Sequence, residues 1–226
     1  MDGMRSVIGE ILPMSVAIAI GPLAIIAAVL MLLSPQARST SSSFLVGWVI
    51  GITVAVVSFT LLSVMLPEPD SGSTSPVVGV IKFILGGLLL VVAALQWRNR
   101  PVEGEKAELP KWMSAIDSMT ADKALGLGFL LAAVNPKNLL LAASAGVIVG
   151  SAALSFRQAA VVVTIYVVLA ACTVLVPVFA YLFASARISR PLDELGTWLV
   201  DNSNLIMAVL FLVLGVAMIG KGISTF

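Results

Sequence analysis

Long apolar stretches, separated by short polar connections, are the feature that most restricts how this chain can fold. A helix needs about 20 apolar residues to cross the roughly 30 Å hydrocarbon core of a bilayer. The sequence offers six such stretches, at about 11–33, 44–66, 77–95, 124–149, 157–184 and 199–220. Backbone groups in a bilayer must satisfy their own hydrogen bonds, so each stretch is expected to be helical. The sequence therefore predicts an all-α, polytopic membrane protein with six transmembrane helices.

Composition agrees with this class and excludes several others. Hydrophobic residues make up 59% of the chain and charged residues 11%, whereas soluble domains average about 45–50% and 25%. A net charge of +1 gives no reason to expect a nucleic-acid partner. The single cysteine cannot exchange with a second thiol, and the chain has no histidine, so neither a redox carrier nor a metal site is expected. No nucleophile–base pair stands out, and we expect neither an enzyme nor a cofactor.

Lysine and arginine are divided unequally between the two sides of the predicted membrane. The connections after the first, third and fifth stretches contain most of them: Arg38, Arg98, Arg100, Lys106, Lys111, Lys123, Arg187 and Arg190. The opposite side has fewer, namely Arg5, Arg157 and Lys221, with Lys82 near it. Because cytoplasmic loops are enriched in Lys and Arg, this predicts that the long connection lies in the cytoplasm and both termini outside.

The two halves of the chain resemble each other in where their helices are interrupted. Pro22 in the first stretch and Pro136 in the fourth lie at similar depths, and each is followed by a half-helix rich in small residues. We therefore predict a three-helix repeat at 1–95, a cytoplasmic linker at 96–123 and a second three-helix repeat at 124–226. Three is an odd number, so the repeats have opposite orientations, as in many secondary transporters with broken helices.

The most informative segment is the run Asn135, Pro136, Lys137 and Asn138 in the middle of the fourth stretch. Proline removes a backbone hydrogen bond, which leaves carbonyl groups of the preceding turn without their usual donor. A lysine at the centre of a membrane helix costs roughly 2.5–3.5 kcal/mol on insertion scales. One interpretation is a polar packing cluster in which Lys137 binds the freed carbonyls. We favour a substrate site in which Lys137 meets an anionic group, because ionisable residues inside membranes are usually functional.

Gly21 and Pro22 form the matching interruption in the first stretch. Alone, this pair is equally compatible with a simple kink that improves packing. Glycine also allows a ligand or another backbone to approach closely. Together with the second interruption, it predicts a site shared between the two breaks.

Other polar and small residues in the stretches have more ordinary explanations. Lys82 is placed so that its side chain either reaches the outer head groups or takes part in function. Thr164 and Thr173 are expected to bind carbonyls of their own helix. Four glycines are expected at close helix crossings, two of them in a G-x-x-x-G pattern: Gly47, Gly51, Gly86 and Gly87. No carboxylate lies at mid-membrane, so proton coupling is not supported.

These motifs resemble the LysE-type exporter superfamily, over essentially the whole chain. Its members have six hydrophobic segments, a Gly-Pro break in the first, a lysine followed by glycines in the third and Asn-Pro-Lys opening the second half. Amino-acid exporters of the superfamily usually have Pro-Gly-Pro in the first segment, whereas this chain has Ile20 before Gly21 and Pro22. It looks most like the actinobacterial GAP or Sap-like group, whose members are implicated in moving peptidoglycolipids or sulfolipids to the cell surface.

The resemblance implies a bacterial inner-membrane transporter that assists glycolipid export. In this hypothesis Lys137, Asn135 and Asn138 engage the head group, the Gly21–Pro22 break lies opposite them, and Lys82 passes the head group outward. The alternatives are export of a small solute, such as an amino acid or a cation, and a non-transporting scaffold that recruits lipid-synthesis enzymes through 96–123. Expected partners are membrane lipids or the glycolipid, lipid-synthesis or export proteins, and a second copy in a homodimer.

Overall fold

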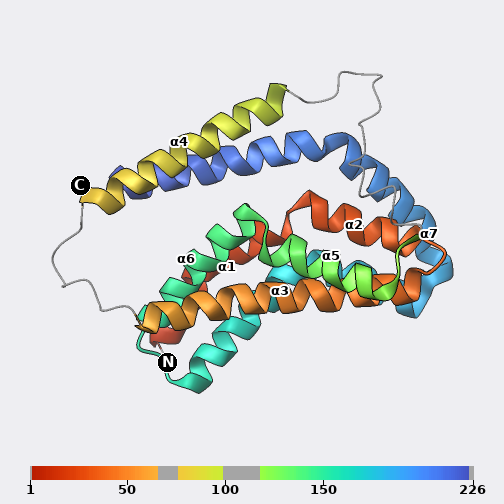
Figure 1. Cartoon of the computed structure of the whole chain (residues 1–226), viewed down its shortest axis with the longest axis horizontal. Helices are drawn as coiled ribbons and strands as arrows, with labels where there is room; N and C mark the ends of the chain where they lie inside the picture. Colours follow the sequence, from red (N-terminus) through yellow and green to blue (C-terminus); the bar gives the residue numbers. More distant parts are fainter. Residues whose placement is uncertain (1, 66–75, 99–117, 224–226) are drawn as a thin grey trace. The chain divides into compact units, whose positions relative to one another are not determined.

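The computed structural model describes residues 2–65, 76–98 and 118–223, and every regular element in these residues is a helix (Figure 1). The all-α prediction is therefore confirmed for the described part of the chain. In chain order the helices are α1 (Asp2–Ala19), α2 (Pro22–Leu33), α3 (Ala37–Met65), α4 (Pro76–Arg98), α5 (Ala121–Ala133), α6 (Pro136–Ser151) and α7 (Phe156–Ile223).

Two helical segments are long and apolar enough to cross a bilayer alone: α3 and the Phe156–Phe183 part of α7. The pairs α1/α2 and α5/α6 reach this length only as bent spans, which makes between two and four spans among the described residues. Two further apolar helical segments are shorter, Gly86–Arg98 and Asn204–Ala217. The chain is thus a multi-pass membrane protein, while the count of six spans and the inverted repeat stay predictions.

The helix limits differ most from the sequence prediction in three places. Helix α3 begins at Ala37, seven residues before the expected start at 44, so much of the polar connection expected before it is helical. Helix α1 begins at Asp2, well before the expected start at 11, because the polar residues before Ile11 continue the helix instead of preceding it. Helix α7 is continuous from Phe156 to Ile223, so the polar connection expected between 184 and 199 is helical as well. That connection contains alanine, arginine and leucine, which are good helix formers, but also Pro191 and Gly196, so intrinsic helix propensity alone does not account for its continuity.

The chain divides into two compact units. The first contains Met1–Pro67 and Leu109–Thr197, and the second Glu68–Glu108 and Trp198–Phe226. Most of the predicted linker 96–123 lies outside the described residues, because only 96–98 and 118–123 are described. The predicted interruptions both belong to the first unit, whereas Lys82 belongs to α4 in the second.

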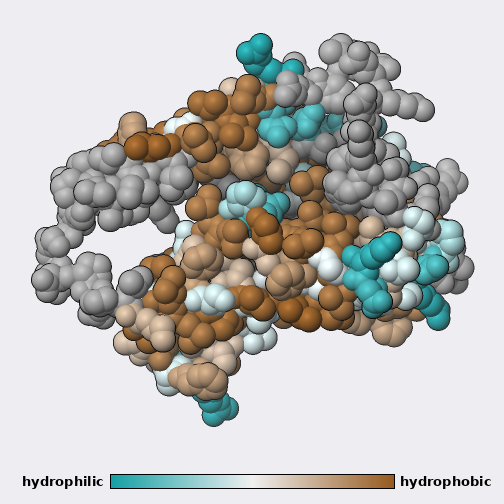
Figure 2. Space-filling model, viewed as in Figure 1, coloured by the Kyte–Doolittle hydropathy of each residue, from teal (hydrophilic) through white to brown (hydrophobic). Residues whose placement is uncertain are grey.

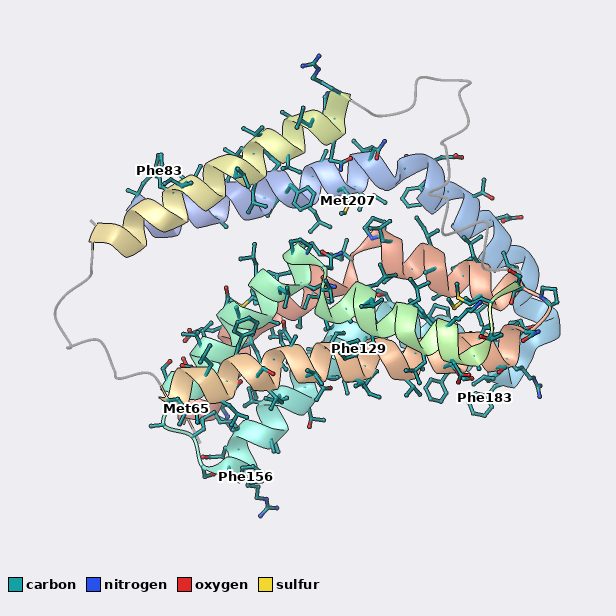
Figure 3. The ribbon with its side chains drawn as sticks, in the orientation of Figure 1. Met65, Phe83, Phe129, Phe156, Phe183 and Met207 are labelled. Atoms are coloured by element: carbon teal, nitrogen blue, oxygen red, sulfur yellow. The ribbon has the colours of Figure 1, made fainter. Side chains whose placement is uncertain are left out.

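In the first unit, α3 packs directly against α5 and α6. A β-carbon on Gly128 would lie only 2.3 Å from the carbonyl oxygen of Phe44, and one on Gly51 would lie 2.6 Å from the Cβ of Ala132. Figure 3 shows Phe129 of α5 at this crossing with α3. Only small residues allow the two backbones to come this close, so the prediction of a close crossing at Gly47 and Gly51 is confirmed.

In the second unit, α4 crosses the C-terminal part of α7 at two glycines. A β-carbon on Gly86 would lie 2.9 Å from the carbonyl oxygen of Gly215, and one on Gly215 would lie 3.0 Å from that of Gly86. The predicted crossing at Gly86 is thus confirmed. The prediction for Gly87 was wrong, because a β-carbon there would have no neighbour within 4 Å. Gly87 comes one residue later and so lies about 100° farther round α4, outside the contact with α7.

The outer surface of the first unit is apolar. Along α3, Val46, Ile50 and Val54 are exposed and recur every four residues, on the side of the helix away from its buried residues. Apolar side chains predominate on the visible surface of α3 in Figure 2. Farther along the chain, Phe156 and Phe183 stand at the two ends of the long apolar part of α7, and both are exposed (Figure 3). Such a surface suits contact with lipid chains.

Candidate functional site

The first break separates α1 from α2 at Ile20 and Gly21, and the two helices are bent by 51°. Pro22 is the first residue of α2 and has no N–H to continue the hydrogen bonds of α1. Gly21 is extended, with ψ at 110°, and its N–H turns back to the carbonyl of Ile18 at 3.0 Å. The carbonyls of Ala17 and Ala19 therefore lose the backbone donors that a continuous helix would supply.

The second break separates α5 from α6 at Val134 and Asn135, with a bend of 61°. Asn135 is the N-cap of α6, and its side-chain oxygen accepts a hydrogen bond of 3.0 Å from the backbone N–H of Lys137. Pro136 follows at the first helical position, where its missing N–H has no cost. Asparagine and proline thus start α6 by a standard capping arrangement, and the oxygen of Asn135 is used for this cap.

Lys137 of α6 connects the two breaks. Its Nζ donates a hydrogen bond of 2.9 Å to the carbonyl oxygen of Ala17, at the end of α1. The lysine is buried, with 7% of its surface exposed. A β-carbon on Gly21 would lie 2.9 Å from this Nζ, so glycine at the first break leaves the room that the ammonium occupies. A cation at the C-terminal end of α1 also interacts favourably with the partial negative charge there.

Asn138, the next residue, binds the second break. Its Nδ2 donates to the carbonyl oxygen of Leu131 in α5 at 3.1 Å, and the residue is only 3% exposed. Leu131 and Ala17 occupy equivalent positions, each five residues before the proline of its break. The first turn of α6 therefore supplies one side-chain donor to each break, and the two carbonyls that accept these hydrogen bonds occupy equivalent positions.

Thr173 of α7 completes the partners of the first break. Its hydroxyl donates a hydrogen bond of 2.6 Å to the carbonyl oxygen of Ala19. The prediction that Thr173 binds a carbonyl of its own helix was wrong, whereas Thr164 does so, to Ala160 at 2.8 Å. In the sequence, Thr164 and Thr173 look alike, since each is a threonine within an apolar stretch. Only Thr173 packs beside the first break, and this contact gives it a partner outside its own helix.

The structure thus brings six of the seven predicted site residues into one place at the two breaks: Gly21, Pro22, Asn135, Pro136, Lys137 and Asn138. The seventh, Lys82, lies in α4 of the second unit, and its side chain lies outside the described residues. Its role stays a prediction.

The junction offers a positive charge without a counter-ion. Among the described residues, no acidic side chain forms an ion pair with Lys137, and the single hydrogen-bond partner of its Nζ is the neutral carbonyl of Ala17. An ammonium has three N–H donors, so two remain for another group. No group of three or more metal-binding side chains is found in the described part of the chain. Chemically, the free N–H donors and the charge of Lys137 can bind an anion.

Comparison with known proteins gives one informative match. The family model described as Sap, sulfolipid-1-addressing protein, matches residues 11–224, which is nearly the whole chain. The chain belongs to the Sap family. Membership confirms the predicted resemblance to the Sap-like group, while the wider LysE superfamily stays a prediction. The match to the Sap family includes both breaks and the whole of α6. No curated protein and no solved structure matches the chain.

Proposed function

We propose that this protein is a membrane transporter that assists the export of a glycolipid with an anionic head group, of the sulfolipid or peptidoglycolipid type. The observation that carries the proposal is Lys137, a buried ammonium at the junction of two broken helices with only a neutral carbonyl as its partner. The description of the Sap family as sulfolipid-1-addressing gives the expected class of cargo.

The energetics of a buried charge favour an anionic ligand. A lysine at the centre of a membrane helix costs about 2.5–3.5 kcal/mol on insertion scales, and more in simulations. One hydrogen bond to a neutral carbonyl offsets part of this cost but leaves the charge uncompensated. A sulfate, phosphate or carboxylate would supply the opposite charge and accept the two remaining N–H groups of Lys137. The amide NH₂ of Asn135 is a further donor beside it, since only the oxygen is used in the cap.

The breaks supply the means of movement. Each bent pair has two short helices joined by two non-helical residues, and hinge motions usually occur at such element ends. In the described conformation Lys137 binds α1, so α6 is attached to the first break. An anionic head group that first binds the two free N–H groups of Lys137 and then also takes the third from the Ala17 carbonyl would release that attachment and allow the half-helices to shift. Binding and movement are then linked through one side chain.

In this proposal the protein lies in a bacterial inner membrane, with the connection 96–123 in the cytoplasm and both termini outside. The acyl chains of the cargo extend into the surrounding lipid along the apolar surface of the first unit. Lipid-synthesis or export proteins, and a second copy of the chain, are the proposed partners. Lys82 is proposed to receive the head group after it leaves the junction.

The test is Lys137→Met, which removes the charge and keeps the length and apolar part of the side chain. Lys123→Met is the matched control, because Lys123 is an exposed lysine at the start of α5. In a host that depends on this protein for a surface glycolipid, we expect Lys137→Met to lower surface glycolipid at least tenfold, measured by mass spectrometry of surface extracts. Lys123→Met should leave it within twofold, with equal protein in the membrane for both variants.

Normal surface glycolipid in Lys137→Met would contradict the proposal. Uptake or efflux of an amino acid or a cation by vesicles containing the protein would favour the small-solute alternative instead. The scaffold alternative predicts that replacing 96–123 with a neutral linker stops export, whereas a transporter should largely retain it.

A further inference from the structure

Asn138 contains a buried acceptor that the protein leaves unused. Its residue is 3% exposed, and its Oδ1 has no hydrogen-bond partner in the described structure. The orientation of the amide is fixed, because the carbonyl of Leu131 accepts a hydrogen bond from it and can bind only the NH₂ end. The free atom is therefore an oxygen, and it needs a donor.

An unpaired acceptor at this depth is unusual, because buried polar groups almost always have partners. It lies in the first turn of α6, one residue after Lys137 and three after the cap Asn135, where the two breaks meet. The oxygen of Asn135 is used in the cap and the hydroxyl of Thr173 binds Ala19. Lys137 and the Asn135 amide keep unused N–H groups, but neither is hydrogen-bonded to Asn138. None of these groups donates to Asn138 Oδ1.

We infer that Asn138 Oδ1 accepts a hydrogen bond from a hydroxyl group of the cargo, which makes Asn138 a specificity-determining residue of the proposed site. This inference rests on the proposed function. It gives the neighbouring residues Lys137 and Asn138 different roles in binding the head group. Lys137 recognises the negative charge, and Asn138 recognises the hydroxyl beside it. A lipid with the charge but no sugar hydroxyl would satisfy only the first of the two.

The chemistry of the junction favours a hydroxyl over a cation as the donor group. A metal ion or an ammonium at Oδ1 would lie in the first turn of α6, at the positive end of that helix, which repels a cation. In addition, Mg²⁺ and Ca²⁺ require about six or more oxygen ligands, and Asn138 Oδ1 supplies one. A hydroxyl is neutral, donates to Oδ1 and can itself accept from a nearby N–H. Among common head groups, a sulfated or phosphorylated sugar presents an anion and hydroxyls within one ring.

The experiment compares two sulfated lipids on the full-length protein in lipid nanodiscs. Sulfatide, a sulfated galactosyl ceramide, has sugar hydroxyls, and cholesterol sulfate has none. The variants are Asn138→Leu, which has a similar volume and no polar atoms, and Lys137→Met. For each probe the affinity of the variant is divided by that of the unaltered protein, so that differences between the lipid bodies cancel.

We expect Asn138→Leu to bind sulfatide about tenfold more weakly, the effect of one lost buried hydrogen bond, and cholesterol sulfate within twofold. Lys137→Met should lose affinity for both probes. If Asn138→Leu weakens both probes equally or neither of them, the inference is overturned, because Asn138 is then only structural or its oxygen binds water. If the unaltered protein binds neither probe, or Lys137→Met binds both normally, the proposed function itself is overturned.

Discussion

At the scale of single residues, the two breaks are held by side chains that replace missing backbone donors. Lys137 serves Ala17, Asn138 serves Leu131 and Thr173 serves Ala19. In hydrocarbon such carbonyls cannot turn to water, so each partner stabilises the bent conformation. The same bonds hold α1 against α6 and α7, which makes the breaks part of the tertiary packing.

Thr173→Val tests this role. Valine has nearly the shape of threonine but cannot donate to Ala19, so we expect the free energy of unfolding to fall by about 0.5–1.5 kcal/mol. Thr164→Val is the matched control, because Thr164 is exposed on the same helix and binds only its own turn. Unfolding of both variants in detergent should show a larger loss for Thr173→Val. Equal losses would mean that the bond across to α1 adds nothing.

At the scale of elements, the first unit depends on how closely α3 and α5 approach. The backbone of α3 passes so near Gly128 that a side chain has no space there. Gly126 lies two residues earlier on the same helix, and a β-carbon on it would have no neighbour within 4 Å. The two glycines therefore differ in packing alone.

Gly128→Ala is expected to force α3 and α5 apart and to lower the free energy of unfolding by about 1–3 kcal/mol, the usual cost of overpacking. Gly126→Ala should be neutral or slightly stabilising, because alanine favours helix over glycine by roughly 0.5–1 kcal/mol. Thermal unfolding of the two variants measures the difference. A Gly128→Ala protein as stable as Gly126→Ala would show that the crossing is looser than described.

The sequence predicted these elements unequally, for physical reasons. Proline has no N–H, so both breaks are visible in the local sequence, and a lysine within an apolar stretch marks the site. The partner of Lys137 was not predictable, because Ala17 lies far away in the chain and contributes only a backbone carbonyl. The continuity of α7 was missed, since polar residues such as those around Arg187 suit a loop and an exposed helix equally well.

At the scale of the whole molecule, each compact unit combines equivalent helical stretches from both predicted repeats. The first unit contains the first two and the fourth and fifth predicted stretches, and the second unit contains the third and the sixth. An inverted repeat pairs the stretches in this way, because its symmetry relates the first to the fourth, the second to the fifth and the third to the sixth. The division into units is therefore compatible with that prediction.

Whether the pair α5/α6 crosses the membrane or turns back within it decides the topology. A bend of 61° leaves the two helices running in broadly the same direction. At 1.5 Å per residue, their 13 and 16 residues then span roughly 35–40 Å end to end, more than the roughly 30 Å of the hydrocarbon core. We therefore expect the start of α5 and the start of α7 to lie on opposite sides.

This can be measured with single cysteines in a Cys172→Ser background, since Cys172 is the chain's one cysteine. Lys123→Cys and Phe156→Cys place the thiols at exposed positions on either side of the pair. With a membrane-impermeant maleimide, Phe156→Cys should react in right-side-out vesicles and Lys123→Cys only in inside-out vesicles, because the lysine-rich connection is expected in the cytoplasm. Reaction of both from one side would make α5/α6 a re-entrant loop, and the reverse pattern would invert the predicted orientation.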